Sequence, residues 1–136
     1  MKELTVAATV ENLEKVTAFV EKQLEDLPCP LKTRMQVNIA IDELFGNIAH
    51  YAYCPEIGLV TIRVEILKNP LAVIITFIDS GVPYDPLAKA DPDTTLSAEA
   101  RHLGGLGIYM VKKSMDDIAY EYKEEKNILR IKKLLE

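Results

Sequence analysis

The chain has 136 residues, a length typical of one folded domain. Apolar residues make up 49% and charged residues 27%, which favours a globular domain with a core over a disordered segment. Sixteen basic and twenty-one acidic residues give a net charge of −5, so we expect no nucleic acid among the partners. A nucleotide site stays compatible with that charge, because backbone N–H groups and a divalent cation can hold phosphates.

The apolar stretches are all shorter than the roughly 18–20 residues that a membrane-spanning helix needs. The first residues also lack the apolar core of a signal peptide. We therefore expect a cytoplasmic protein with no membrane partner.

The spacing of apolar residues predicts the strands and helices. Apolar residues at steps of three and four predict amphipathic helices, and alternating or continuous apolar runs predict strands. In chain order, the expected elements are a strand at 3–9, helices at about 10–27 and 31–52, strands at 59–67 and 71–78, a helix at about 104–116, and strands at 118–122 and 128–134. This order predicts an α/β two-layer sandwich, with three helices on one face of a mixed, mostly antiparallel sheet.

Two polar residues of the second predicted helix, Glu43 and Asn47, are four positions apart and so share one helix face among apolar neighbours. One interpretation is structural, a polar surface stripe or a hydrogen bond between helices. The other is a site in which the carboxylate acts as a general base and the amide oxygen binds a hard cation such as Mg2+. The pair alone leaves both interpretations open.

Asp79 follows the apolar strand predicted at 71–78, and Gly81 comes two residues later. Aspartate and glycine are common in turns at strand ends, which is one explanation. The alternative is a ligand site at the edge of the sheet. There the Asp79 carboxylate would accept a hydrogen bond from an exocyclic amine, and Gly81 would let a flat ring approach the backbone.

Three glycines, Gly104, Gly105 and Gly107, surround Leu106 just before the third predicted helix. A glycine turn at a helix N-terminus can present free N–H groups to phosphate oxygens. The segment lacks the Gly-Lys-Ser/Thr ending of a Walker A loop and the third glycine of a dinucleotide fingerprint. A flexible hinge with a tight turn is the alternative.

In this order, the three segments resemble the motifs of the bacterial anti-sigma-factor serine/threonine kinases. These are small members of the ATPase superfamily that includes gyrase, histidine kinases and MutL. The first motif matches Glu43-x-x-x-Asn47, the second matches Asp79 to Pro86, and the third matches Gly104 to Gly107. The resemblance covers about residues 4–134, and its most specific part is the Pro-aromatic-Asp-Pro ending of the second motif. It implies a Bergerat-type ATP-binding fold.

The resemblance also implies a role for each matching residue. Asn47 would bind Mg2+, and Asp79 would bind the adenine amino group of ATP, with Gly81 beside the ring. The glycine segment at 104–107 would hold the phosphates. Glu43 would be the catalytic base that accepts the proton of a serine or threonine hydroxyl.

The activity implied by the resemblance is that of an ATP- and Mg2+-dependent protein serine/threonine kinase. Residues 1–136 would form a single ATP-binding domain with an ATP lid at about 87–103. Members of the family act as anti-sigma factors and phosphorylate a small anti-sigma antagonist protein. The implied partners are therefore that antagonist, a sigma factor and a second copy of the chain in a homodimer.

One place departs from the family pattern. The family often has Lys or Arg three positions after the motif asparagine and then His, whereas this chain has His50 and Tyr51. The difference keeps open a nucleotide-dependent partner-binding module without kinase activity. A third interpretation is a detached ATP-binding domain of a histidine kinase, against which the ending Pro83-Tyr84-Asp85-Pro86 counts.

Overall fold

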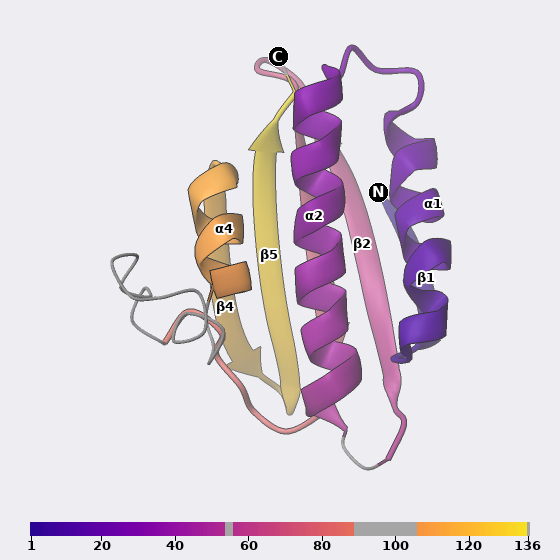
Figure 1. The fold of residues 1–136 in the computed structure, drawn as a ribbon, viewed down its shortest axis with the longest axis vertical. Helices are drawn as coiled ribbons and strands as arrows, with labels where there is room; N and C mark the ends of the chain where they lie inside the picture. The colour runs from indigo at the N-terminus through magenta and orange to yellow at the C-terminus, as the bar shows by residue number, and fades with distance from the viewer. Residues whose placement is uncertain (54–55, 89–105, 136) are drawn as a thin grey trace.

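The computed structural model describes residues 1–53, 56–88 and 106–135, which fold into a layer of helices on a β-sheet (Figure 1). In chain order the elements are β1 (Lys2–Ala7), the 3-10 turn η1 (Val10–Asn12), α1 (Leu13–Leu24), α2 (Leu31–Asn47), the π-helical segment η2 (Ile48–Ala52), β2 (Leu59–Leu67), β3 (Ala72–Asp79), α4 (Leu106–Ser114), β4 (Asp117–Lys123) and β5 (Lys126–Leu134).

Two predicted helices differ in detail from the observed ones. The first begins as the short turn η1 and becomes α-helical only at Leu13. The second is α-helical to Asn47 and then widens into η2 for five residues. Apolar periodicity cannot separate an α-helical turn from a π-helical one. Single π-helical turns often mark functional sites, and this one directly follows a predicted site residue.

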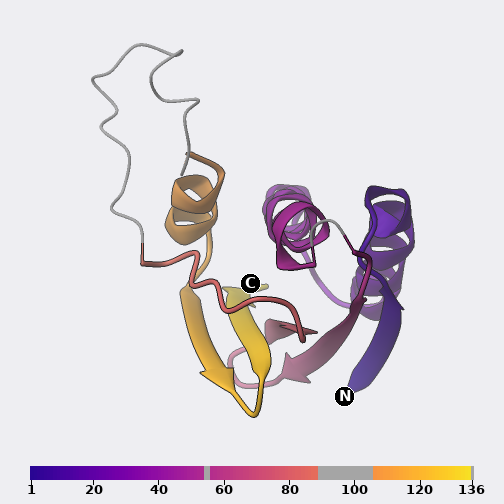
Figure 2. The ribbon, with the colours of Figure 1, turned by 90° about the horizontal axis from the view of Figure 1, so that it is seen from below.

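The five described strands form one sheet in the order β1-β2-β3-β5-β4, and every pairing is antiparallel. Helices α1, α2 and α4 all lie on one face of this sheet (Figure 2). The predicted α/β two-layer class is therefore confirmed, with no parallel pair among the described strands.

The core lies between the helices and the sheet. In β2 the residues Val60, Ile62 and Val64 are buried, while Arg63 and Glu65, which alternate with them, are exposed. This alternation is the one-sided pattern predicted for the strand. Against the strands pack the buried faces of the helices, with these core residues: Val16, Val20 and Leu24 of α1, and Val37, Ala40, Ile41, Leu44 and Phe45 of α2.

The topology brings three distant parts of the chain to one end of the sheet. Asp79, the last residue of β3, is paired with Asn127 near the start of β5. The end of α2 and the segment η2 lie at the same end, the lower one in Figure 1. This end of the molecule therefore holds two of the predicted site segments.

Candidate functional site

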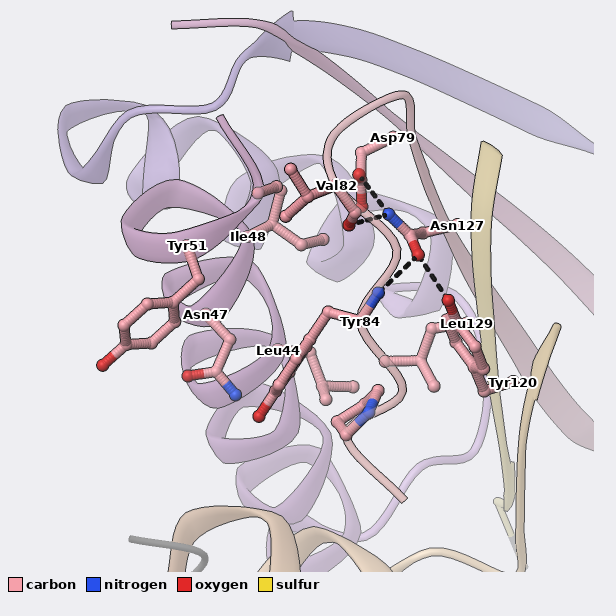
Figure 3. A pocket seen from close by; sticks show the side chains of 12 residues that line it. Leu44, Asn47, Ile48, Tyr51, Asp79, Val82, Tyr84, Tyr120, Asn127 and Leu129 are labelled. Carbon is pink, nitrogen blue, oxygen red and sulfur yellow. Dashed lines mark hydrogen bonds between the residues drawn. The ribbon is translucent and has the colours of Figure 1, made fainter. Parts of the chain in front are cut away.

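A hollow of about 430 Å3, a volume that includes space open to solvent, lies where the ends of α2, β3 and β5 meet. Its walls are mainly apolar, with a few polar side chains that converge on it, as in small-molecule sites. Figure 3 shows the residues that line it, which are Leu44, Asn47, Ile48, Tyr51, Ala52, Asp79, Val82, Tyr84, Pro86, Tyr120, Asn127 and Leu129. Two predicted site residues, Asn47 and Asp79, are thus brought together.

Asp79 is buried at the end of β3, with only 5% of its surface exposed. Its Oδ1 atom accepts hydrogen bonds from the N–H of Gly81 and from Nδ2 of Asn127, each at 2.9 Å. Within the described ranges, its second oxygen, Oδ2, accepts no hydrogen bond. A carboxylate held through one oxygen can accept a hydrogen bond from a ligand at the other.

Gly81 lies directly against the backbone of Ala52, the last residue of η2. A Cβ atom at Gly81 would come within 2.2 Å of the Ala52 carbonyl oxygen. The same oxygen accepts the N–H of Val82 at 2.9 Å. The missing side chain therefore lets the loop after β3 pack on η2. The sequence did not indicate this packing requirement, and the predicted approach of a flat ring to Gly81 stays a prediction.

Tyr53 joins the end of η2 to two strands. Its hydroxyl donates to the carbonyl oxygen of Leu59 and accepts the N–H of Ser80, both at 2.7 Å. A Cβ atom at Gly58 would lie 2.2 Å from the Tyr53 ring, so the ring packs flat against that glycine. The sequence predicted no role for Tyr53, because its partners become neighbours only in the folded sheet.

Asn127 is a buried polar residue of β5 for which no role was predicted. Only 6% of its surface is exposed. Its Nδ2 atom donates to Asp79 and, at 2.9 Å, to the carbonyl oxygen of Val82. Its Oδ1 atom accepts the N–H of Tyr84 at 3.1 Å and the hydroxyl of Tyr120. The available sequence signal was an asparagine at a core-facing position of the strand, two residues before the buried Leu129.

Tyr120 contributes a hydroxyl from β4, an edge strand of the described sheet. Burial raises the pKa of this phenol above 10.0, and the negative charges of Asp85 and Asp79 raise it further, against a lowering contribution from the backbone of Tyr84. The hydroxyl therefore stays protonated at neutral pH and donates to Asn127.

Glu43 and Asn47 are both half-buried on α2, as the helical spacing predicted. Nδ2 of Asn47 donates to Oε1 of Glu43 at 3.4 Å, a long hydrogen bond. Gly107, in the first turn of α4, lies against the same carboxylate, because a Cβ atom there would be 2.1 Å from Cδ of Glu43. The structure therefore brings one residue of the third motif into contact with the first motif.

The rest of the third motif is only partly described. Gly104 and Gly105, together with positions 89–103 of the predicted lid, lie outside the described residues. Leu106 is the first residue of α4. The start of the predicted lid is described, and there the N–H of Leu87 donates to Oδ1 of Asp85 at 2.8 Å.

The two residues that depart from the family pattern lie in η2. His50 is exposed, and Tyr51 lines the hollow. Their rings are in a tilted contact with centroids 6.1 Å apart.

The described ranges contain no group of three or more His, Cys, Asp and Glu side chains placed to hold a metal ion. None of their helices combines the length and the apolar character needed to cross a bilayer.

Comparison with curated proteins gives relatives named serine-protein kinase RsbW. One from Bacillus anthracis is 32% identical over 101 residues, covering 71% of this chain and 61% of the relative. One from Bacillus cereus strain AH187 is 27% identical over 132 residues, covering 93% of this chain and 74% of the relative. The chain thus spans about three fifths of the length of the first relatives that it matches.

Two solved structures share the fold. The RsbU and RsbW domains of a Mycobacterium tuberculosis protein match with a TM-score of 0.67 and 14% identity, covering 99% of this chain and 33% of that one. The histidine kinase domain of a blue-light activated kinase from Erythrobacter litoralis matches with a TM-score of 0.58 and 15% identity, covering 92% of this chain and 60% of that one.

The sequence profile described as "Histidine kinase-like ATPase domain" matches residues 6–133. That match spans nearly the whole chain and confirms the resemblance seen in the three motifs. The protein belongs to the family of histidine kinase-like ATPase domains.

Proposed function

We propose that the protein is an ATP- and Mg2+-dependent serine/threonine protein kinase that acts as an anti-sigma regulatory factor and phosphorylates a small anti-sigma antagonist protein. The observation that carries the proposal is the arrangement of three distant segments. Asn47 and Asp79 line one hollow, and Gly107 contacts Glu43 one helical turn before Asn47. The relatives named serine-protein kinase and the ATPase description of the family support it.

The base of ATP would bind at Asp79. Its Oδ1 atom is already occupied by two donors, so Oδ2 is the atom left to accept the adenine amino group. The apolar walls of the hollow, including Leu44 and Ile48, suit the faces of a flat ring.

Asn47 fits the role of a Mg2+ ligand. Its Nδ2 atom donates to Glu43, which leaves the amide oxygen, a hard ligand, without a partner in the described part of the chain. When bound together with ATP, Mg2+ would offset the negative charge of the phosphates.

Glu43 would accept the proton of the substrate hydroxyl. Its carboxylate is half-buried and is held by the Asn47 amide, so it is oriented without being neutralised by a basic side chain in the described ranges. An oriented carboxylate beside the phosphates is the group that a hydroxyl nucleophile needs.

The remaining parts of the proposal follow from the family resemblance. The segment 104–107 would hold the phosphates, and residues 87–103 would close over them as a lid in a single ATP-binding domain of residues 1–136. The partners would be the antagonist, a sigma factor and a second copy of the chain, all in the cytoplasm.

A partner-binding module without kinase activity is the second candidate. One contact favours it, since Gly107 packs against the Glu43 carboxylate and covers part of the proposed base. In that case ATP would order the segments around the hollow, and the partner would bind without being phosphorylated.

The nucleotide site is tested by thermal unfolding with and without Mg2+-ATP. A ligand at 100 times its Kd stabilises by about 2.7 kcal/mol, which raises the midpoint of a domain of this size by roughly 5–10 °C. We expect that rise in the wild type and its loss in Asp79→Asn. An unchanged wild-type midpoint at millimolar Mg2+-ATP would refute nucleotide binding.

Phosphate transfer separates the two candidates. The wild type and Glu43→Gln are incubated with γ-labelled ATP and a candidate antagonist protein. The kinase proposal expects label on a serine or threonine of the antagonist with the wild type. It expects ATP binding without transfer with Glu43→Gln. A stable complex that never acquires label would establish the binding module instead.

A further inference from the structure

The side-chain amide of Asn127 uses all of its hydrogen-bonding capacity inside the protein. An amide offers two N–H donors and one oxygen with two acceptor positions. Nδ2 donates to Oδ1 of Asp79 and to the carbonyl oxygen of Val82, both at 2.9 Å, and makes a longer contact of 3.5 Å with the carbonyl oxygen of Gly81. Oδ1 accepts the backbone N–H of Tyr84 at 3.1 Å and the hydroxyl of Tyr120. Figure 3 shows Asp79, Val82, Tyr84 and Tyr120 around the amide.

A saturated amide cannot also bind a ligand without breaking one of these bonds. Asn127 lines the hollow, yet it has no free donor or acceptor to offer. Its neighbour Asp79 differs, because both bonds from described residues go to Oδ1. Asn127 therefore acts on a ligand through the groups that it holds, and among these Asp79 is the side chain with an open acceptor.

The partners also determine which way the amide points. Turning it over would place its oxygen against the Asp79 carboxylate and the Val82 carbonyl, where acceptors would face one another. It would also place Nδ2 against the N–H of Tyr84. Buried polar groups that face a like group lose the full value of their hydrogen bonds. In the observed orientation the hydroxyl of Tyr120 donates to Oδ1 and completes the hydrogen bonds of the amide.

We propose that Asn127, held in place with the help of Tyr120, is a positioning residue that fixes the Asp79 carboxylate so that a single oxygen faces the base of a bound nucleotide. This inference rests on the proposed nucleotide site and adds a device for selectivity to it. With one fixed acceptor, the site favours a purine that presents an amino group, as in ATP, over one that presents a carbonyl oxygen, as in GTP.

The inference is tested by the affinities of the full chain for Mg2+-ATP and Mg2+-GTP in the wild type, Asp79→Asn, Asn127→Ala and the double variant. We expect Asn127→Ala to weaken ATP binding by about tenfold, the value of one good hydrogen bond. The double variant should bind ATP no more weakly than Asp79→Asn, because the second effect passes through the first. Losses that multiply in the double variant would overturn the inference.

Since Asn127→Ala empties a buried position and can unfold the chain, Tyr120→Phe is the second variant. It removes one hydroxyl and leaves the ring in place. We expect its ATP-to-GTP affinity ratio to fall by about threefold or more, with a small change in melting midpoint. A purely structural role for Tyr120 would lower the midpoint and leave the ratio unchanged, which would overturn the inference.

Thr76→Val provides the matched control. Thr76 is a buried polar residue of β3, three positions before Asp79. It is outside the cluster formed by Asn127, Asp79 and Tyr120. Its substitution is expected to leave the ATP-to-GTP ratio unchanged. If the wild type binds no Mg2+-ATP, the proposed function itself fails. If it binds and both cluster variants keep the wild-type ratio, only the role of Asn127 fails.

Discussion

The two ends of the hollow are built differently. At the Asp79 end, the polar side chains Asp79 and Asn127 are 5% and 6% exposed and are joined at 2.9 Å. At the Asn47 end, Asn47 and its partner Glu43, one helical turn away on α2, are half-buried, and their hydrogen bond is 3.4 Å long. One end is a hydrogen-bonded network in the interior that leaves Oδ2 of Asp79 open in the described part of the chain, and the other is a loose pair near the surface.

This difference indicates that the two ends have different roles in binding. A network that already holds its one open acceptor in place needs little reorganisation when a ligand arrives, so it suits recognition of a fixed group. A loose pair can adjust its geometry around a ligand with variable charge and shape. In the proposed kinase, the base would bind to a preformed end, and the phosphates with Mg2+ would complete the other end.

The largest expected effect is at Gly81, on the preformed end. Gly81→Ala would drive a Cβ atom to within 2.2 Å of the Ala52 backbone. Because backbone cannot move aside as a side-chain tip can, we expect a loss of about 2–3 kcal/mol in the free energy of unfolding. Urea denaturation measures it.

Gly46→Ala is the matched control for that substitution. A Cβ atom at Gly46 meets nothing within 4 Å, and the residue is inside α2. Alanine is the better helix former there, so we expect a gain of about 0.5–1 kcal/mol. Equal effects of the two substitutions would contradict the contact between Gly81 and Ala52.

The next largest effect on stability is expected at Tyr53, which also lies near the Asp79 end and bonds to Ser80. Tyr53→Phe removes a hydroxyl that serves Leu59 and Ser80. We expect a loss of about 1–2 kcal/mol, as two backbone groups lose their partner. Tyr122→Phe is the control, since Tyr122 is an exposed tyrosine of β4 and should change stability by less than about 0.5 kcal/mol. Indistinguishable urea midpoints for the two variants would show that the Tyr53 hydroxyl does not stabilise the fold.

A smaller effect on stability is expected where Gly107 contacts Glu43, next to the loose pair of Glu43 and Asn47. Gly107→Ala would place a Cβ atom 2.1 Å from the Glu43 carboxyl carbon, but that carboxylate is the tip of a flexible side chain and can move. We expect less than about 1 kcal/mol of lost stability. Displacing the proposed base should slow phosphate transfer more than it weakens ATP binding. A variant that transfers phosphate at the wild-type rate would show that the contact has no role in the reaction.

The smallest effect concerns the stability of the fold at alkaline pH. The pKa of Tyr120 is raised in the folded protein, mainly by burial, so the unfolded chain loses this proton more readily. The contribution of the protonated Tyr120 hydroxyl to the free energy of unfolding is therefore complete below about pH 10. It is lost as the pH rises through the pKa that Tyr120 has in the folded protein. Urea midpoints of the wild type and Tyr120→Phe, measured from pH 8 to 11, should converge at the alkaline end. A difference that stays constant over that range would contradict the assignment.

Much of the fold could be predicted because its determinants are local. The alternation in residues 59–67 and the three- and four-residue steps in 13–24 report which side of each element is buried. The helix bounds were less accurate, since the change from α-helix to π-helix after Asn47 leaves no mark on the apolar spacing.

The sequence by itself determined the fold class, the three motifs and the family, because each is written in periodicity or short spacing. Only the tertiary structure decided how the motifs are supported. Asn127 reaches Asp79 across 48 positions of sequence through the β3–β5 register, and Gly107 reaches Glu43 through the packing of α4 near α2. Such contacts depend on which elements become neighbours in the fold, and this cannot be read from patterns within a few residues of the chain.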